Sequence, residues 1–251
     1  MNLLRPRACV ETLGALAPLL SCVWLGACSS SPETSAVERG RHLFETKALS
    51  ASSLNDYSCA TCHDLQSSDT PSKKTGAPLA GVTLRAQLWG GQEADLLRSV
   101  NACRNYFMTA SQPLAATDDD ARDLYAYLES LEPGDDSPQP FTIVTGIDPL
   151  PAGDASHGLE LFATACASCH GASHTGARRL SDRVPILPED TIAEHVGYTP
   201  LQLRLVFIEK IRHGLFLGYS GVMPPFSTER LSNSDVSDLL EALEVFVPPA
   251  E

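Results

Sequence analysis

Apolar residues follow the spacing of an amphipathic helix in two separate stretches of the chain. In the first stretch the apolar positions are Leu124, Tyr127, Leu128 and Leu131. The same spacing recurs 112 positions later, at Val236, Leu239, Leu240 and Leu243. Residues at i, i+3, i+4 and i+7 lie on one face of a helix, so each stretch predicts a helix that buries that face.

A short glycine signature precedes each of these helices. It reads Gly-x-x-Leu-Phe and occurs at Gly40 and again at Gly158. Between the two copies, residues 134–152 are rich in Pro, Asp and Gly, a composition typical of a linker. The pattern therefore predicts an all-α protein with two tandem domains of one fold, residues 36–133 and residues 153–251.

The N-terminal segment has a different pattern. Arg5 and Arg7 precede an apolar run over residues 13–27. A helix of about 15 residues is about 22 Å long, shorter than the roughly 30 Å hydrocarbon core of a bilayer. We therefore interpret residues 1–27 as a secretory signal peptide, which predicts export into an oxidising compartment.

The end of this segment resembles a bacterial lipobox. The residues are Leu25-Gly26-Ala27-Cys28, followed by a Ser-rich stretch. The resemblance implies that Cys28 is acylated and becomes the mature N-terminus, with residues 28–35 as a tether. It also implies a lipid-anchored protein on the periplasmic side of a bacterial cell envelope, at the outer membrane. A plain signal peptide cleaved elsewhere and an uncleaved anchor are the alternatives.

The chain is acidic, with 31 Asp and Glu against 18 Lys and Arg and a formal net charge of −13. Removal of the signal peptide takes away two bases and one acid, so the net charge of the mature chain becomes −14. Nucleic-acid binding requires clustered Lys and Arg, so we expect no nucleic-acid partner.

Cysteine is the unusual part of the composition. Eight cysteines are present, and five lie beyond the predicted signal and tether: Cys59, Cys62, Cys103, Cys166 and Cys169. An odd number in an oxidising compartment means that at least one cysteine does not belong to a disulfide.

Four of these cysteines fall in two Cys-x-x-Cys-His motifs, which end at His63 and His170. On a helix, both thiols and the imidazole of such a motif face the same direction. This arrangement suits covalent attachment of haem, because the two sulfurs form thioethers to the porphyrin and the histidine reaches the iron. We therefore expect two covalently bound haem c groups, held by Cys59, Cys62, Cys166 and Cys169.

Other uses of these cysteines fit less well. A Cys₄ zinc site would need both pairs, but 103 residues separate Cys62 from Cys166, against roughly 15–20 in compact zinc modules. A thiol–disulfide redox motif belongs to a βαβ context that the pattern lacks. Structural disulfides would not explain the histidine after each pair.

Methionine use points to the same chemistry. Apart from Met1, the chain contains only Met108 and Met223, one after each motif. A methionine thioether is a soft ligand for the sixth position of haem iron and raises its reduction potential. We expect Met108 and Met223 to be the distal ligands, with His63 and His170 as the proximal ones.

With these motifs, both halves resemble class I cytochrome c domains. The segment 221–226 around Met223 resembles the methionine loop of that family. The resemblance implies two small helical domains with His–Met iron, joined here by the Pro/Asp-rich linker. It also implies that an aromatic residue of each last helix packs on the first helix. Tyr127 fits this pattern, whereas Leu239 takes the equivalent place in the second domain.

The family resemblance further implies a backbone partner for each histidine. A carbonyl near Pro78-Leu79 is expected to orient His63, and that of Pro185 or Pro188 to orient His170.

The first domain contains a second candidate for the distal ligand. Asn101-Ala102-Cys103 lies just before Met108 and is similar to thiosulfate dehydrogenases and related sulfur-oxidation dihaem cytochromes, in which a Cys after an Asn ligates the catalytic iron. A thiolate at Cys103 would lower the potential and create an open or switchable site, whereas Met108 would make a plain electron carrier. A buried free thiol is the remaining alternative.

The main functional prediction is one-electron transfer by an exported, membrane-anchored dihaem cytochrome, a carrier rather than an enzyme. The alternative is a haem oxidoreductase of the thiosulfate dehydrogenase type whose first haem is catalytic. A zinc-bound structural lipoprotein is a third, non-redox alternative. The acidic charge predicts a redox partner protein with a basic docking patch, and the lipid anchor predicts contact with a membrane.

Overall fold

The computed structural model describes residues 34–66, 73–131, 134–217 and 221–246. The predicted signal peptide, Cys28 and most of the tether lie outside the described residues. Within these ranges the chain is helical and forms no strand, apart from one isolated bridge between Leu88 and Glu93. The prediction of an all-α fold is confirmed.

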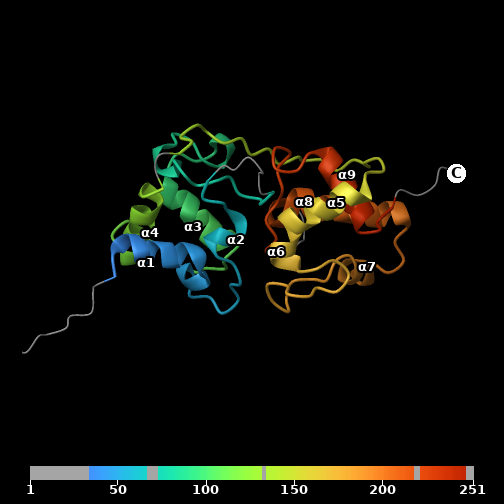
Figure 1. Cartoon of the computed structure of the whole chain (residues 1–251), viewed down its shortest axis with the longest axis horizontal. Coiled ribbons are helices and arrows are strands. Elements are labelled where there is room, and N and C mark those ends of the chain that lie inside the picture. The colour runs from blue at the N-terminus through green and yellow to red at the C-terminus, as the bar shows by residue number, and fades with distance from the viewer. Residues whose placement is uncertain (1–33, 67–72, 132–133, 218–220, 247–251) are drawn as a thin grey trace, which may run out of the picture. The chain divides into compact units, whose positions relative to one another are not determined.

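Two groups of helices follow one another along the chain (Figure 1). The first group comprises α1 (Ala36–Glu45), α2 (Cys59–Cys62), α3 (Leu96–Tyr106) and α4 (Asp119–Glu129), with the 3₁₀ turns η1 (Lys47–Leu49), η2 (Val82–Leu84) and η3 (Trp89–Gly91). The second group comprises α5 (Ala155–Leu161), the π-helical turn η4 (Phe162–Cys166), α6 (Ala167–His170), α7 (Glu189–Glu194), α8 (Pro200–Leu217) and α9 (Asn233–Ala242). Among the helices described, none is long and apolar enough to cross a membrane.

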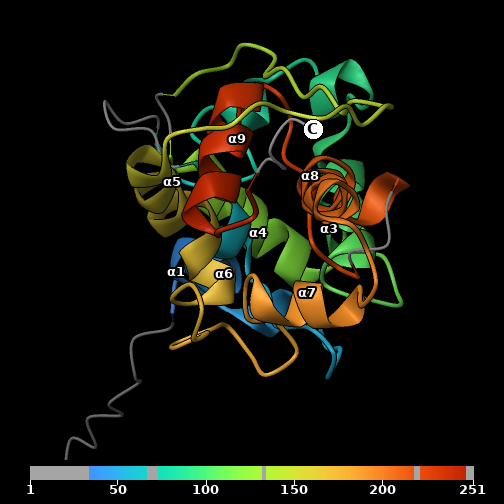
Figure 2. The ribbon, with the colours of Figure 1, turned by 90° about the vertical axis from the view of Figure 1, so that its right-hand side faces the viewer.

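In each group the first and last helices cross at a glycine. Helix α1 lies against α4 in Figure 1, and α5 lies against α9 in Figure 2. A Cβ on Gly40 would lie 1.9 Å from the carbonyl oxygen of Asp123, and a Cβ on Gly158 would lie 2.0 Å from that of Asp238. Two helix backbones can approach this closely only where no side chain separates them, which explains the glycine signature.

The residues at the two crossings show that the predicted alignment of α4 with α9 is wrong. A Cβ on Gly40 would lie 2.7 Å from the Cβ of Tyr127, and a Cβ on Gly158 would lie 2.8 Å from that of Ala242. Ala242 therefore takes the place of Tyr127, not Leu239, and the two last helices are related by 115 positions instead of 112. Apolar residues recur every three or four positions on an amphipathic helix, so a shift of three still aligns apolar residues.

Each group of helices has a hydrophobic core of its own. The first core contains Leu43, Phe44, Leu49, Leu124, Tyr127 and Leu128. The second contains Leu161, Phe162, Phe207, Ile208, Leu239 and Leu240. In the first core the rings of Phe44 and Tyr127 lie 5.5 Å apart, which confirms the expected aromatic contact between α1 and α4.

The linker contacts both domains. The ring of Phe141 meets that of Trp89 in the first domain edge-on, with centroids 5.7 Å apart and planes at 88°. The next residue, Thr142, donates its backbone N–H to a carboxylate oxygen of Glu229 in the second domain, at 3.0 Å. The Pro- and Asp-rich stretch is therefore held at both sides by specific contacts.

Candidate functional site

The first Cys-x-x-Cys-His motif lies at the wall of an apolar cavity. Helix α2 contains Cys59 and Cys62 and ends there, because His63 is extended, with φ −121° and ψ 142°. All three residues line the cavity. Apolar side chains complete much of its wall, among them Leu49, Val82, Leu96, Val100 and Leu128. The two thiols and the imidazole thus meet around one space, although the imidazole is carried by an extended residue and not by the helix.

A backbone segment orients the imidazole of His63. Its Nδ1 lies 2.8 Å from the carbonyl oxygen of Ala77, directly before the expected Pro78-Leu79. A carbonyl only accepts hydrogen bonds, so Nδ1 carries the proton and the Nε2 lone pair is available to a metal. Burial lowers the pKa of His63, which favours the same neutral form. A Cβ on Gly76 would lie 2.3 Å from the imidazole Cε1, so only glycine lets the segment cross the ring this closely.

Both candidate distal ligands of the first site line the same cavity as His63. Cys103 lies on α3, and Met108 follows the end of that helix. Met108 is buried, and its carbonyl accepts a hydrogen bond of 2.8 Å from the Ser50 hydroxyl. Burial, and after it the charge of Cys59, raise the pKa of the Cys103 thiol to about 12, so these apolar surroundings favour the protonated thiol.

The second motif has a different helical geometry. The π-helical turn η4 ends at Cys166, and Cys169 and His170 lie on α6. The Nδ1 of His170 lies 2.9 Å from the carbonyl oxygen of Pro185, so of the two expected partners Pro185 is the one bonded. His170 is 8% exposed, and burial lowers its pKa. The imidazole is therefore neutral and protonated on Nδ1, as in the first motif.

The loop that carries Met223 is fixed to α8 through its backbone. The N–H of Leu215 donates to the carbonyl of Met223 at 2.9 Å. A Cβ on Gly214, whose φ is +50°, would lie 2.6 Å from the same carbonyl oxygen. Met223 and Cys166 pack against one hydrophobic core, that of the second domain. The structure thus brings the methionine and one attachment thiol to the same core.

The second motif lies next to the first. Cys169 packs against the hydrophobic core of the first domain. Burial, and after it the charges of Cys169 and Cys62, raise the pKa of the Tyr57 phenol. Burial and the charge of Cys169 likewise raise the pKa of Cys62. Cys59 packs against the same core, so an attachment thiol of each motif contacts the core of the first domain.

These residues fit a covalently bound haem. Each motif offers two thiols beside a neutral imidazole with a free Nε2 lone pair, which is the donor set that haem c requires. In the first domain an apolar cavity adjoins these donors, as a porphyrin needs. The cavity also contains thioether and thiol sulfur, the soft donors suited to the remaining iron position.

Two buried arginines support the first site and carry no recognisable signal in the sequence. The Nη2 of Arg85 donates to the carbonyls of Pro78 at 2.8 Å and Ala80 at 3.0 Å, which lie one and three positions after Ala77, whose carbonyl is bonded to His63. The Nε of Arg104 donates to the carbonyl of Leu49 at 2.9 Å. Arginine is usually exposed, so composition and spacing predict surface positions for both residues.

Comparisons with known proteins agree with this geometry. Residues 37–132 match a family model described as Cytochrome c, and residues 153–241 match one described as Cytochrome C oxidase, cbb3-type, subunit III. No curated protein matches the chain. Among solved structures, the thiosulfate dehydrogenase (TsdBA) from Marichromatium purpuratum in its as-isolated form matches with a TM-score of 0.38 and 18% identity over 86% of this chain. The present chain spans about half of that structure's chain, 48%. The two family models show that the chain belongs to the c-type cytochromes and consists of two cytochrome c domains in tandem, a type of domain that binds haem c covalently for electron transfer.

Proposed function

We propose that this chain is an exported, lipid-anchored dihaem cytochrome that carries electrons one at a time. In this proposal His63 and His170 are the proximal iron ligands. The residues that hold the two haems are Cys59, Cys62, Cys166 and Cys169, and the distal ligands are Met108 and Met223.

The observation that carries the proposal is that the two motif histidines have the same hydrogen bonding. Each is buried and directs Nδ1 at a backbone carbonyl, at 2.8 Å for His63 and 2.9 Å for His170. Each therefore offers Nε2 to a metal beside a pair of thiols. A histidine that served packing alone would not need two adjacent thiols in both domains.

Bound haem supplies a one-electron iron couple. The residues of the chain keep the histidines neutral, exclude water through the apolar wall of the first cavity, and hold the sulfur atoms in place. Because Cys59 and Cys169 pack against one hydrophobic core, the two attachment sites lie close together. A short path between them suits electron exchange within the chain.

One observation favours a second candidate function. Cys103 lines the same cavity as Met108 and His63, so its sulfur is also available to the sixth iron position. A thiolate there would lower the reduction potential of the first haem. The first site would then suit a haem oxidoreductase that acts on a small substrate.

Near-infrared magnetic circular dichroism of the holoprotein separates these two functions. We expect Met108→Ala and Met223→Ala each to remove one methionine-to-iron band, and Cys103→Ala to leave both bands unchanged. A thiolate signature that disappears in Cys103→Ala, together with an unchanged spectrum in Met108→Ala, would contradict the carrier and support the oxidoreductase. A pyridine haemochrome assay should give two haems per chain, and a count of one would overturn the dihaem proposal.

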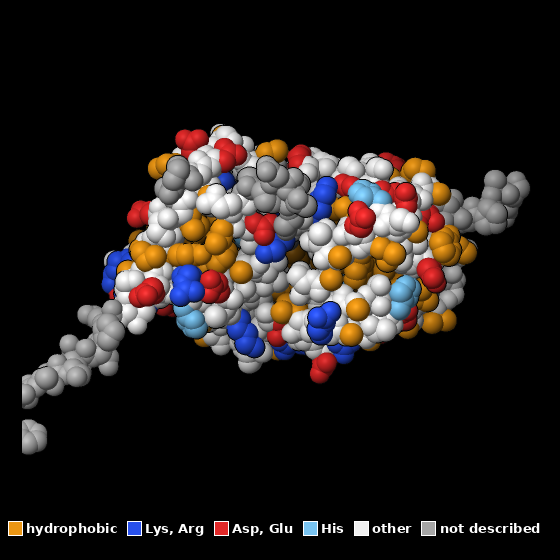
Figure 3. All heavy atoms as spheres, viewed as in Figure 1, with side chains coloured by type: hydrophobic (Ala, Val, Ile, Leu, Met, Phe, Trp, Pro, Cys, Tyr) orange, Lys and Arg blue, Asp and Glu red, His pale blue; other side chains and the backbone are white. Residues whose placement is uncertain are grey.

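The same proposal places the protein at the outer membrane of a bacterial envelope, anchored through Cys28. The lipobox-like residues before Cys28 support this location, and fractionation of cells that express Cys28→Ser tests it. We also propose a redox partner with a basic docking patch. Acidic side chains are spread over the face shown in Figure 3, and the net charge is −13 for the full chain. The association rate with such a partner should fall as ionic strength rises.

A further inference from the structure

Residues 74–77 form the backbone segment that crosses the imidazole of His63. Besides the bond from the imidazole to Ala77, the N–H of Gly76 donates to the carbonyl of Cys62 at 2.8 Å. The segment therefore contacts both the histidine and the attachment helix of the first site. Any group that holds this segment in place also sets the orientation of the imidazole.

The second domain supplies groups that hold segment 74–77. Arg230 donates from Nε to the carbonyl of Lys74 at 2.8 Å and from Nη2 to the carbonyl of Gly76 at 3.0 Å. The hydroxyl of Thr75 donates to the carbonyl of Pro225 at 2.6 Å. Three consecutive residues of the segment are thus bonded to the second domain.

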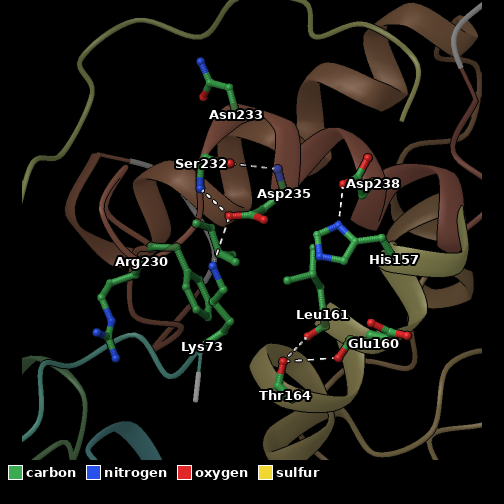
Figure 4. Close-up of polar contacts among 12 residues, drawn as sticks. Lys73, His157, Glu160, Leu161, Thr164, Arg230, Ser232, Asn233, Asp235 and Asp238 are labelled. Atoms are coloured by element: carbon green, nitrogen blue, oxygen red, sulfur yellow. Dashed lines mark hydrogen bonds and ion pairs between the residues drawn. The ribbon is translucent and has the colours of Figure 1, made fainter. Parts of the chain in front are cut away.

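The residue before the segment makes a further contact with the second domain. Lys73 forms an ion pair of 3.3 Å with Asp235, at the start of α9. In Figure 4 the side chain of Arg230 points away from α9 toward the ribbon of the first domain. The contacts of Lys73 and Arg230 thus bind neighbouring residues of the first domain to the second.

The stretch of the second domain that carries Arg230 also carries Met223. Pro225, which accepts from the segment, lies two positions after Met223. Phe226 is bonded to α8, since its N–H donates to the carbonyl of Ile211 at 2.8 Å. The proximal segment of the first site and the methionine loop of the second are therefore parts of one hydrogen-bonded unit.

Arg230 also brings a positive charge to the first site. Its side chain lines the cavity that contains His63, and an arginine side chain stays protonated in proteins. A fixed positive charge disfavours ferric iron relative to ferrous iron, and this raises the reduction potential.

We propose that Arg230 is a positioning residue of the second domain that raises the reduction potential of the first haem, by holding segment 74–77 over His63 and by its charge. This inference rests on the proposed dihaem function. It makes the first haem site incomplete without the second domain.

The test is an EPR-monitored redox titration of the full-length holoprotein and four variants. Arg230→Gln removes the charge, and Arg230→Lys keeps the charge but cannot bond both carbonyls in the same geometry. Arg183→Gln is the matched control, because Arg183 also crosses to the first domain, where it bonds to Asp56 at 2.6 Å. The EPR signal that changes in Met223→Ala identifies the second haem, and the other signal belongs to the first.

We expect Arg230→Gln to lower the potential of the first haem, with a smaller shift of the second, while Arg183→Gln leaves both unchanged. Arg230→Lys should give an intermediate potential and altered g values for the first haem. An unchanged first potential in Arg230→Gln, or an equal shift in Arg183→Gln, would overturn the inference. If Arg230→Gln loses haem, the potential of the first haem in Arg230→Lys serves instead. An unchanged potential, or a shift equal to that in Arg183→Gln, would then overturn the inference. A wild-type protein with fewer than two haems would instead contradict the proposed function.

Discussion

The two cytochrome domains build the same helix crossing with different side chains. In the first domain Arg39 bonds to both carboxylate oxygens of Asp123, at 2.6 and 2.8 Å. In the second, His157 takes the equivalent place and lies 2.8 Å from Asp238 (Figure 4). Close backbone approach at a glycine is common to both crossings, whereas the charged pair differs. The geometry therefore depends on the glycine, and the ionisable pair decides the pH range in which the crossing is reinforced.

The aromatic packing at the crossing also differs. Phe44 of α1 has Tyr127 as its ring partner on α4. Phe162 follows α5 at the position that corresponds to Phe44, but the residue equivalent to Tyr127 is Ala242. The first crossing thus has an aromatic pair where the second has a methyl group.

Filling the crossing itself should have the largest effect. Gly40→Ala and Gly158→Ala each place a methyl group 1.9–2.0 Å from a backbone carbonyl oxygen, so the helices must separate. We expect each variant to lower the free energy of unfolding by about 3 kcal/mol, the upper range for overpacking. Guanidinium denaturation of the holoprotein measures this loss.

Gly146→Ala is the matched control for both glycine variants. Nothing lies within 4 Å of a Cβ at Gly146, so its free energy of unfolding should change by less than about 0.5 kcal/mol. If Gly40→Ala lowers the free energy of unfolding and Gly158→Ala changes it no more than Gly146→Ala does, the two crossings do not depend equally on their glycines.

Replacing the phenylalanines should have an intermediate effect. Phe44 and Phe162 are both buried, at 2% and 5% exposure. We expect Phe44→Leu to cost about 1 kcal/mol more than Phe162→Leu, because Phe44 also loses its aromatic partner. A double-mutant cycle of Phe44→Leu with Tyr127→Leu should give a coupling free energy of about 1 kcal/mol. Equal costs in both domains together with zero coupling would refute this explanation.

The smallest effect is a difference in pH dependence between the histidine pair of the second crossing and the arginine pair of the first. The hydrogen bond to Asp238 raises the pKa of His157 above its ordinary 6.5. A raised pKa contributes stability that is complete below the ordinary value and is lost as pH rises through the folded value. The hydrogen bond from Arg39 lowers the pKa of Asp123 below 3.8, so that contribution is lost only as pH falls through the lowered value.

As pH rises from 6.5 through the raised pKa of His157, the second crossing should therefore weaken while the first stays constant. Hydrogen-exchange protection of α5 and α9, corrected for intrinsic rates, measures this change against α1 and α4. His157→Gln should abolish the pH dependence, and His42→Gln, at an exposed histidine of α1, should leave it intact. If His157→Gln loses hydrogen-exchange protection with rising pH as the wild type does, a group other than His157 causes the pH dependence.

The sequence was most informative where contacts are local. The helices over residues 119–129 and 233–242 follow from apolar spacing, and the paired thiols follow from spacing within a single helical turn. The family resemblance implies Pro185 or Pro188 as the backbone partner of His170, and the fold selects Pro185. The predicted register between α4 and α9 is wrong by three residues, because an amphipathic pattern repeats itself at that shift and only the contact of α9 with α5 distinguishes the alternatives.

The all-α class, the two-domain organisation and the identity of both motifs follow from the sequence alone, since these depend on periodicity and on residues a few positions apart. The carbonyl that bonds each histidine is evident only from the folded chain, which also brings Cys103 and Met108 to one cavity. The fold also places Arg230 on the segment over His63, 154–156 residues away in the chain. Contacts of this kind depend on how the domains pack, and a buried arginine that donates to backbone carbonyls needs no particular residue type in its partners.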